Sequence, residues 1–487
     1  MQINLNAQPL GIFQAHKDIG AVLHPGSITF NKSSGDYILT GSGANIWNNN
    51  DQFHYAWRKL KGDFILQARV SFAGKGQDPH RKLGWMIRHS LDTNSSSVNA
   101  TIHGDGLTSL QFRRTANGTM EEKRFDLKSP DIIQLERRGN LYIMSVASEG
   151  QSYITQEVAD INFGEEVYAG LFICAHNKDV LEKGRFDNVR IVKPAPVNFT
   201  PYRDFLGSHI EVFDIATGKR NIVFSSEQSL QAPNWTKDGT SLIYNSNGSI
   251  YRLKLSDPKP VLVNTGKVKS NNNDHVISFD GEMLGLSSSS PDNKYSSVVY
   301  TVPIKGGTPK QITPTGPSYL HGWSPDKKYL VFTGQRDNEF DIYRIDADGT
   351  NETRLTTAAG LDDGPEYSPD GAYIYFNSTR TGNMQIWRMK ADGSEQVQLT
   401  NDEYNNWFPH VSPDGKSIVF LSFMNDVKPD DHPFYKHVYI RMMPVSGGTP
   451  KVLVYLYGGQ GTINTPSWSP DSKKFAFVSN SDSLIEK

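Results

Sequence analysis

Residues 361–398 read LDDGPEYSPDGAYIYFNSTRTGNMQIWRMKADGSEQVQ. Within this stretch, Ser-Pro-Asp-Gly (368–371) and Ala-Asp-Gly (391–393) have the composition of tight turns. Short runs of β-branched, aromatic and alternating apolar residues lie between the turns, and such runs are typical of strands. The stretch therefore predicts one antiparallel sheet of four short strands.

The same pattern recurs across the second half of the chain. Its turn begins at Thr236, Ser278, Ser324, Ser368, Ser412 and Ser469, so the intervals are 42, 46, 44, 44 and 57 residues. A four-strand unit that repeats every 40–50 residues or so is typical of a propeller blade. Six copies predict a six-bladed β-propeller, because one such sheet cannot bury both of its faces alone.

The last copy of the repeat ends after only two strands. Residues 210–214 and 221–224 look like an outer pair of strands with no inner pair before them. We expect this pair to complete the last blade. Strands from the N- and C-terminal ends of the propeller would then pair, close the ring and remove its exposed edges.

Composition excludes several classes of protein. The 487 residues carry a net charge of −2, so nothing favours nucleic acid or acidic lipid as a partner. The single cysteine excludes a disulfide framework within the chain and a cysteine-based metal site. No apolar run of about 18 residues occurs, so we expect no membrane span. The first residues lack a signal-peptide pattern, which fits either a cytoplasmic protein or one whose signal has been removed.

The first 195 or so residues contain no copy of the repeat. Strand-like runs such as 64–70 and 167–174 are separated there by Gly, Asn, Asp and Ser, as in a β-sandwich. Val-Lys-Pro-Ala-Pro at 192–196 then interrupts regular structure. We predict an all-β chain with a jelly-roll β-sandwich at 1–197 and the propeller at 198–487.

Three segments of the first domain resemble a concanavalin-like jelly-roll module. They are DQFHY at 51–55, which GDF at 62–64 follows, LGWMIR at 83–88 and FDNV at 186–189, and the resemblance covers most of residues 10–192. Such modules are often appended to glycan-active proteins. The resemblance therefore implies a role with carbohydrate.

The second half resembles the TolB-like six-bladed propellers. The Ser-Pro-Asp-Gly turns and the RIDADG pattern at 344–349 carry this resemblance. The architecture includes non-catalytic interaction proteins, accessory domains of peptidases and polysaccharide-active enzymes, so it implies a fold rather than an activity. We expect a location outside the cytoplasm, either periplasmic or secreted.

The segments that enter the innermost strands should converge on one mouth of the propeller channel. The candidates there for binding a substrate are Asn234, His275, His321, Trp407, Phe408, His432, Lys436, Gln460 and Asn464. The candidates for catalysis are Asp274, Asp363, Glu366, His410 and Tyr435. Their gathering at equivalent blade positions favours a ligand site, whereas the alternative is a set of side chains that bond to backbone groups around a water-filled channel.

A divalent metal is one candidate cofactor. His275, His321 and His410 could ligate such an ion together with Glu366 or Asp274. Their offsets from the turn serine differ, however, and adjacent residues of a strand point to opposite sides. These offsets argue against a symmetric cage of ligands.

Acid–base chemistry on a sugar is the other interpretation. Hydrolysis needs two carboxylates, and Glu366 with Asp274 or Asp363 is the best pair in the sequence. Elimination by a lyase needs a base and an acid, for which His410 and Tyr435 are candidates. The sequence does not choose between the two reactions.

The fifth interval contains a long insertion, MNDVKPDDHPFYKH at 424–437. Its charged and aromatic residues are typical of a lid that contacts a substrate. The alternative is a solvated loop that Phe434 and Tyr435 hold against the blade.

Aromatic residues occur at two kinds of position in the repeat. Trp235, Trp323 and Trp468 precede the turn serine or threonine at one offset, which predicts packing between blades. Trp407 and Phe408 break that pattern, so we predict that they form a platform on which a sugar stacks.

Two functions of different class remain open. The first is a carbohydrate-active protein that binds an oligosaccharide or polysaccharide at the propeller mouth and cleaves it as a hydrolase or lyase. The second is a non-catalytic TolB-like scaffold that binds a protein, a peptide or a glycan. A peptidase is disfavoured, because no Gly-x-Ser-x-Gly elbow follows the propeller.

Overall fold

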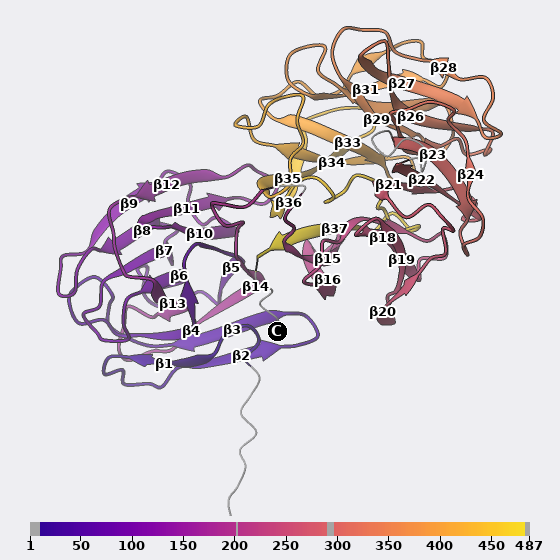
Figure 1. The fold of residues 1–487 in the computed structure, drawn as a ribbon. Coiled ribbons are helices and arrows are strands. Elements are labelled where there is room, and N and C mark those ends of the chain that lie inside the picture. Colours follow the sequence, from indigo (N-terminus) through magenta and orange to yellow (C-terminus); the bar gives the residue numbers. More distant parts are fainter. Residues whose placement is uncertain (1–9, 201–202, 290–296, 483–487) are drawn as a thin grey trace, which may run out of the picture. The chain divides into compact units, whose positions relative to one another are not determined.

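The computed structural model describes residues 10–200, 203–289 and 297–482. Every regular element in these ranges is a strand, and the chain divides into two compact units between Pro194 and Ala195. In Figure 1 the first unit runs from indigo to purple, and the second runs from magenta through orange to yellow. No helix in this part of the chain is long and apolar enough to cross a membrane.

The first unit consists of two antiparallel sheets of seven strands each, as the sequence predicts for a β-sandwich. The first sheet runs in the order β1 (Ala15–Ile19), β4 (Phe53–Lys61), β13 (Glu166–Cys174), β6 (Lys82–Arg88), β7 (Ser97–His103), β8 (Thr108–Arg113) and β9 (Glu121–Phe125). The second runs in the order β12 (Ile154–Val158), β11 (Leu141–Ala147), β10 (Ile132–Arg138), β5 (Phe64–Ala73), β14 (Glu182–Val192), β3 (Asp36–Gly41) and β2 (Ser27–Asn31).

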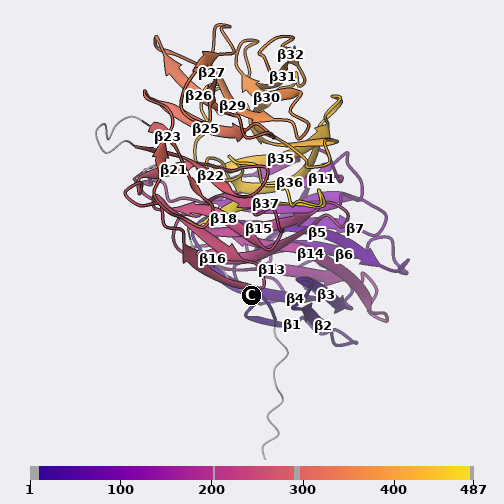
Figure 2. The same cartoon turned by 90° about the vertical axis from the view of Figure 1, so that its right-hand side faces the viewer.

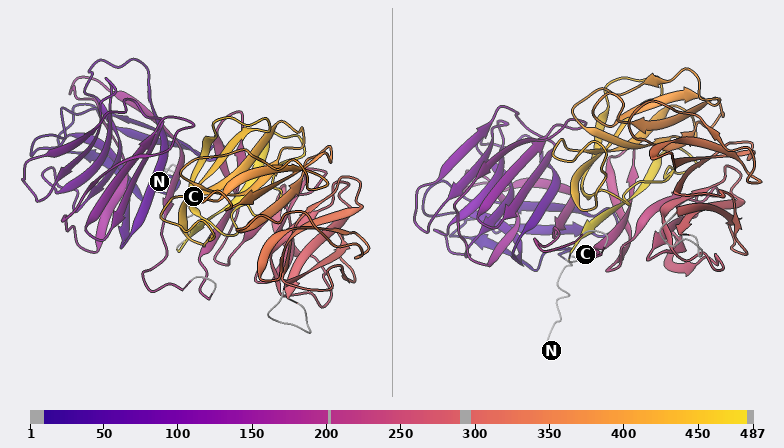
Figure 3. Two further views of the ribbon diagram at one scale, coloured as in Figure 1. Left: turned by 90° about the horizontal axis from the view of Figure 1, so that it is seen from above. Right: turned by 45° about the horizontal axis from the view of Figure 1, so that its top comes forward.

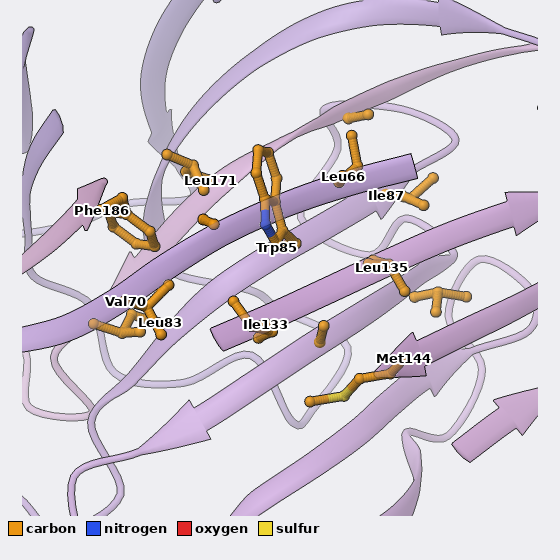
Figure 4. Packing of buried hydrophobic residues seen from close by; sticks show 14 of the residues in the cluster. Leu66, Val70, Leu83, Trp85, Ile87, Ile133, Leu135, Met144, Leu171 and Phe186 are labelled. Carbon is orange, nitrogen blue, oxygen red and sulfur yellow. The ribbon is translucent and has the colours of Figure 1, made fainter. Parts of the chain in front are cut away.

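The two sheets of this unit share one apolar core. Trp85 and Leu171 from the first sheet belong to the same buried cluster as Ile133, Leu135 and Phe186 from the second (Figure 4). Alternating residues of each strand supply this core, which is the pattern expected when one face of each sheet is buried. The concanavalin-like relationship of this unit stays a prediction.

The second unit contains five complete four-stranded blades, which follow one another in chain order (Figure 3). Blade 1 is β17 (Gln231–Trp235), β18 (Ser241–Ser246), β19 (Ser249–Lys254) and β20 (Asp257–Leu262). Blade 2 is β21 (Asn271–Ile277), β22 (Met283–Ser289), β23 (Ser297–Pro303) and β24 (Lys310–Gln311). Blade 3 is β25 (Ser318–Trp323), β26 (Tyr329–Arg336), β27 (Glu339–Asp346) and β28 (Thr353–Arg354).

The next two blades repeat this arrangement. Blade 4 is β29 (Asp362–Tyr367), β30 (Tyr373–Ser378), β31 (Gln385–Lys390) and β32 (Val397–Gln398), whose labels lie together in Figure 2. Blade 5 is β33 (Asn405–Val411), β34 (Ser417–Phe423), β35 (Lys436–Pro444) and β36 (Lys451–Gly458).

The turn that marks each repeat is held by its own side chains. In blade 4, the Ser368 hydroxyl donates to Asp370 Oδ1 at 2.6 Å and accepts the backbone N–H of Tyr373 at 3.0 Å. The corresponding Ser/Thr–Asp bond is 2.6 or 2.7 Å long in all six copies. This bond explains why the repeat requires a hydroxyl residue followed two positions later by Asp.

The sixth blade is assembled from both ends of the propeller, as predicted. β37 (Lys474–Ser481) pairs with β15 (Gly207–Asp214), and β15 pairs with β16 (Lys219–Ser226). Residues 462–468 form the inner edge, where Ala476 N donates to Ser467 O at 2.9 Å. In Figure 1, yellow β37 lies beside magenta β15.

A buried ion pair ties the three strands of this closing blade together. Glu211 on β15 is fully buried and accepts hydrogen bonds from Arg220 on β16 at 2.7 and 3.2 Å. It also accepts the hydroxyl of Ser479 on β37 at 2.6 Å. One carboxylate therefore joins the N-terminal strands of the propeller to its last strand.

We predict that Glu211→Ala destabilises the propeller by about 3–5 kcal/mol, because it leaves the Arg220 guanidinium buried without its partner. The free energy of unfolding, measured by urea denaturation, checks this value. Glu395→Ala is the control, since it breaks the solvent-exposed Lys390–Glu395 pair and should change nothing measurable. Equal stability of Glu211→Ala and the parent protein would contradict the role of this pair in closure.

Candidate functional site

The innermost strands of all five complete blades share a local irregularity. Each of them shifts register before it reaches the turn. The shifts lie between Gln231 and Asn234, Asn271 and His275, Leu320 and Gly322, Asp363 and Glu366, and Trp407 and His410. A β-bulge bends its strand and re-aims the side chains on either side. The bulges therefore divide each inner strand into an entry segment and a turn segment.

The entry segments and the bulges that follow them bring three titratable side chains together. His321 Nε2 lies 3.3 Å from Asp363 Oδ1, and that oxygen also accepts the Thr333 hydroxyl at 2.6 Å and the Gly364 N–H at 2.7 Å. Asp274 on β21 interacts electrostatically with both His321 and Asp363. Gly364 has a φ of +63°, a conformation that favours glycine at this bulge.

The three groups of this cluster hold their protons differently. Burial raises the pKa of Asp274 to about 6. Burial also opposes ionisation of Asp363, but its hydrogen bond to His321 and the charge of that ring hold the pKa of Asp363 below its usual value. Burial disfavours the charged form of His321, yet the nearby Asp274 and Asp363 carboxylates raise its pKa overall. The cluster therefore contains a carboxyl that exchanges its proton near neutral pH beside an ionised carboxylate.

Several predicted binding residues surround this cluster. Asn464 donates to Gln460 Oε1 at 2.9 Å, and Gln460 lies 3.5 Å from Asn273 on β21. His432, from the long insertion, packs edge-on against Phe408 with ring centres 5.4 Å apart, and its charge acts on Asp363. The insertion thus reaches the entry segments, as predicted for this loop.

Two predicted residues, Glu366 and His410, form a separate buried pair. His410 Nδ1 lies 2.6 Å from Glu366 Oε2, and His410 Nε2 donates to the carbonyl of Ile463 at 2.6 Å. The other oxygen of Glu366 accepts the N–H of Val411 at 3.0 Å. Both side chains are therefore occupied with neighbouring blades, and Glu366 does not join Asp274 and Asp363 as a pair for hydrolysis.

The turn segments enclose an axial cavity of about 260 Å³. All six blades contribute to its lining, which is mostly aromatic, aliphatic and proline. The lining residues that matter here are Trp235, Ile277, Phe279, Trp323, Tyr367, Pro369, Val411, Pro413, Pro466, Trp468 and Pro470. Trp235, Trp323, Trp468 and Tyr367 are buried, as the predicted packing between blades requires, but together they also form part of the wall of a cavity.

The polar groups that line this cavity are largely engaged, apart from the exposed side chain of Lys237. Asn234 donates to the carbonyl of Pro466, and its Oδ1 accepts the N–H of Ile277 at 3.0 Å. Trp323 Nε1 donates to Val276 O at 3.0 Å, and Trp468 Nε1 donates to His410 O at 2.9 Å. The indole N–H of Trp235 has no hydrogen-bond partner within the described residues. The cavity therefore offers an occupant mainly apolar surface.

The structure disagrees with the roles predicted for three residues. Trp407 and Phe408 are 0% and 2% exposed and pack in the core of blade 5, so they present no open platform for a sugar. Tyr435 is also buried, and its hydroxyl accepts the N–H of Leu206 at 3.1 Å. Burial raises the pKa of Tyr435 to about 12, which fits a tether better than a catalytic acid. Phe434 packs on Phe205 beside it, so these two aromatic rings anchor the insertion.

The predicted histidine cage for a metal is also not formed. His275 is fully buried with Nε2 3.3 Å from the carbonyl of Ile243, and burial lowers its pKa to about 4. His321 faces Asp363, whereas His410 is held between Glu366 and Ile463. The three rings have different partners because the bulge separates their positions along the strand. Lys436 lies half-buried at the start of β35.

Sequence reasoning missed that the turn segments form a cavity. The signal was available, because Trp or Tyr precedes the turn hydroxyl in four blades while Ile277 and Val411 occupy that place in the other two. Four large rings and two smaller side chains around one axis leave space that six rings would fill.

Known proteins resemble the propeller. Residues 321–429 match the TolB beta propeller domain family, PD40. This chain belongs to the TolB-like propeller family. An uncharacterised protein from Agrobacterium fabrum is 48% identical over 272 residues, which are 56% of this chain and 92% of the relative.

Two solved structures extend this comparison of the TolB-like propeller. One, from Agrobacterium tumefaciens and provisionally described as a TolB, is 47% identical with a TM-score of 0.55. The match covers 57% of this chain and 99% of the chain in that structure. TolB from Acinetobacter baumannii is 19% identical with a TM-score of 0.42, covering 54% of this chain and 66% of its own.

The protonation of Asp274 predicts a pH dependence of stability. The folded protein holds this proton up to about pH 6, whereas an unfolded aspartate releases it near pH ~4. The folded state therefore binds more protons between these values, and its stability falls as the pH rises through them. Asp274→Asn should remove this loss. Between pH 4 and pH 7 its free energy of unfolding should therefore rise by on the order of 3 kcal/mol relative to that of the parent protein.

Urea denaturation at a series of pH values measures this difference. Asp426→Asn, which changes an exposed carboxyl of the long insertion, is the control. Parallel stability curves for Asp274→Asn and the parent protein would show that Asp274 does not keep its proton in the folded state.

Proposed function

We propose that this TolB-like propeller is a binding module that holds an apolar segment of a partner protein in its axial cavity. The observation that carries the proposal is the composition of the cavity wall, to which aromatic and proline residues from all six blades contribute. Small apolar pockets with a few polar groups are the usual sites at which proteins anchor a ligand. Because the wall belongs to six different sheets, it is rigid and formed before a ligand arrives.

The chemistry of the wall favours a peptide over a sugar. A bound sugar needs hydrogen-bond partners for its hydroxyls, and unpaired polar groups in a buried site cost free energy. The amide of Asn234, both oxygens of Glu366 and the indoles of Trp323 and Trp468 are already bonded to neighbouring blades. The indole N–H of Trp235 is buried without a partner within the described residues, so it offers little to the hydroxyls of a sugar.

The size of the cavity limits what can enter it. A volume of about 260 Å³ accommodates one or two side chains rather than a folded domain. Phe279, which is 38% exposed, lines the same cavity and offers apolar surface to residues outside it. The occupant is therefore best described as an apolar or aromatic anchor within an extended segment, and buried anchors of this kind supply most of the affinity in protein interfaces.

The location of the protein is part of this proposal. We infer a periplasmic or secreted protein, because the TolB-like propellers to which the sequence is similar are expected outside the cytoplasm. Fractionation of cells that express the native gene tests this inference.

Phage display of random dodecapeptides against the full chain tests the proposed binding. We expect the enriched peptides to share an apolar or aromatic residue and to bind the purified protein. Ile277→Trp should weaken their binding at least about tenfold, or about 1.4 kcal/mol, because it adds a ring to the cavity at a position where other blades already carry one. Isothermal titration calorimetry measures the affinity.

The matched control is Val397→Ala, which removes an exposed apolar side chain of blade 4 that does not line the cavity. It should bind the peptides as the parent protein does. Peptides that bind Ile277→Trp with unchanged affinity would place the interaction elsewhere and overturn the proposal.

A second function, the cleavage of an oligosaccharide, is favoured by one specific observation. Asp274, His321 and Asp363 combine a carboxyl with a pKa of about 6, an ionised carboxylate and a histidine in one cluster. Groups with divergent pKa values are those that serve as general acid and general base. The jelly-roll resemblance of the first unit also fits a carbohydrate partner.

Product analysis after incubation with a panel of oligosaccharides tests this second function. Any cleavage should fall at least about a hundredfold in Asp274→Asn and His321→Gln, which remove an acid–base group. Asp426→Asn should retain full activity. Cleavage that survives in Asp274→Asn would exclude this cluster as the catalytic site.

A further inference from the structure

A group of metal-ligating side chains lies in the first unit, away from the propeller. His80 precedes β6, His103 ends β7, and Asp105 lies in the turn between β7 and β8. One nitrogen or oxygen from each lies within 4.8 Å of the other two. Among residues 10–200, 203–289 and 297–482, this is the one such group of three. We propose that it binds a divalent transition-metal ion of the Zn²⁺ type.

The two loops that carry these ligands are fixed to each other by their backbones. Gly104 N donates to Arg81 O at 2.9 Å, and Asp105 N donates to Pro79 O at 2.8 Å. Arg81 is itself held by a buried ion pair with Glu182 at 2.6 Å. The backbones that carry the ligands are therefore fixed relative to each other before a metal binds.

His103 has the surroundings of a metal ligand. It is 5% exposed, and its Nδ1 has no hydrogen-bond partner within the described residues. Its Nε2 lies 3.1 Å from the side-chain amide of Gln111, whose Oε1 is also unpartnered. Rotating that amide by 180° makes Gln111 accept the Nε2 proton and leaves a lone pair on Nδ1, and such amide orientations are assigned from the hydrogen-bond network. A hydrogen-bonded partner on the second ring nitrogen is the usual arrangement for a metal-bound histidine.

Some groups around the three ligands favour a bound cation, and one opposes it. His103 is buried, and a histidine ligates a metal through a neutral ring nitrogen. Asp78, which pairs with His176 at 3.4 Å, adds negative charge nearby, and the ring of His176 lies 5.4 Å from that of His80. The Lys82 amine opposes a cation, but burial lowers its pKa and Asn45 accepts its hydrogen bond at 3.1 Å.

The donor set determines the class of ion. Imidazole nitrogens suit Zn²⁺, Cu²⁺, Ni²⁺ and Fe²⁺, whereas Ca²⁺ and Mg²⁺ prefer sites made of oxygen alone. Asp105 Oδ1 already accepts the N–H of Leu107 at 3.0 Å, so its other oxygen is the one left for the metal. Two histidines and one carboxylate leave a fourth position for water or for a group on a ligand. Because His80 and Asp105 are exposed, that position is reachable from solvent.

Titration of the tag-free, chelator-treated full chain with ZnCl₂ in a calorimeter tests the site. We expect one ion to bind per chain, and Co²⁺ to give visible ligand-field bands of a nitrogen- and oxygen-ligated site. His80→Ala and Asp105→Asn change exposed side chains, so both variants should fold and both should bind Zn²⁺ at least about tenfold more weakly. His24→Ala removes another exposed histidine of the same unit and should bind as the parent protein does.

Each result decides the proposal. A tenfold or greater loss in His80→Ala and Asp105→Asn, with none in His24→Ala, supports the assigned ligands. Absence of Zn²⁺ binding, or equal binding by the parent protein and both ligand variants, overturns it. Near-ultraviolet circular dichroism of each variant confirms that the fold is intact before the titration.

Discussion

The pairing of β37 with β15 is the interaction on which the propeller depends. It joins the last strand of the propeller to the first strand of the propeller. Glu211 reinforces this pairing through its bonds to Arg220 and Ser479. Closure removes two free sheet edges. It also brings Pro466, Trp468 and Pro470 beside the residues of blade 1, without which the axial cavity would lack one side.

A second constraint separates polar from apolar side chains along the propeller channel. The register shift in each inner strand separates polar entry segments from apolar turn segments. Asp363 lies at the start of the register shift of its strand and Asp274 and His321 lie within the shifts of theirs, whereas Trp235 and Trp323 lie after the shift. Strands that converge on an axis are crowded, and a bulge lets each of them bend while its backbone groups remain bonded. The propeller channel therefore contains two sites of different character. Peptide binding is proposed for the apolar cavity, and oligosaccharide cleavage for the polar cluster.

The repeat itself could be read from the sequence. The Ser/Thr–Asp turns predicted six blades and the shared closing blade correctly, because each turn is stabilised locally by its own hydroxyl and carboxylate. For the insertion, the sequence left a lid and an anchored loop open, and the structure shows Phe434 and Tyr435 as anchors. Length and strand pattern also predicted a two-sheet sandwich in the first unit.

Side-chain direction could not be read in the same way. His275, His321 and His410 were grouped because they enter the mouth at similar blade positions, but the register shift of each inner strand gives each ring its own direction and partners. Trp407 and Phe408 were expected to form a platform for a sugar, but β33 begins at Asn405 and carries both into the core. The group of His80, His103 and Asp105 had no sequence signal, because backbone bonds between two loops bring these residues together.

The central claim is that the closed ring forms a binding cavity at its turn end. Fluorine NMR of the protein with 5-fluorotryptophan tests it most directly, since the eight tryptophans report from both units. Addition of a peptide selected for binding should shift the resonances of Trp235, Trp323 and Trp468 and leave those of Trp57 and Trp85 in the sandwich unchanged. Shifts confined to the sandwich tryptophans, or no shift of the three cavity tryptophans at saturation, would contradict the account.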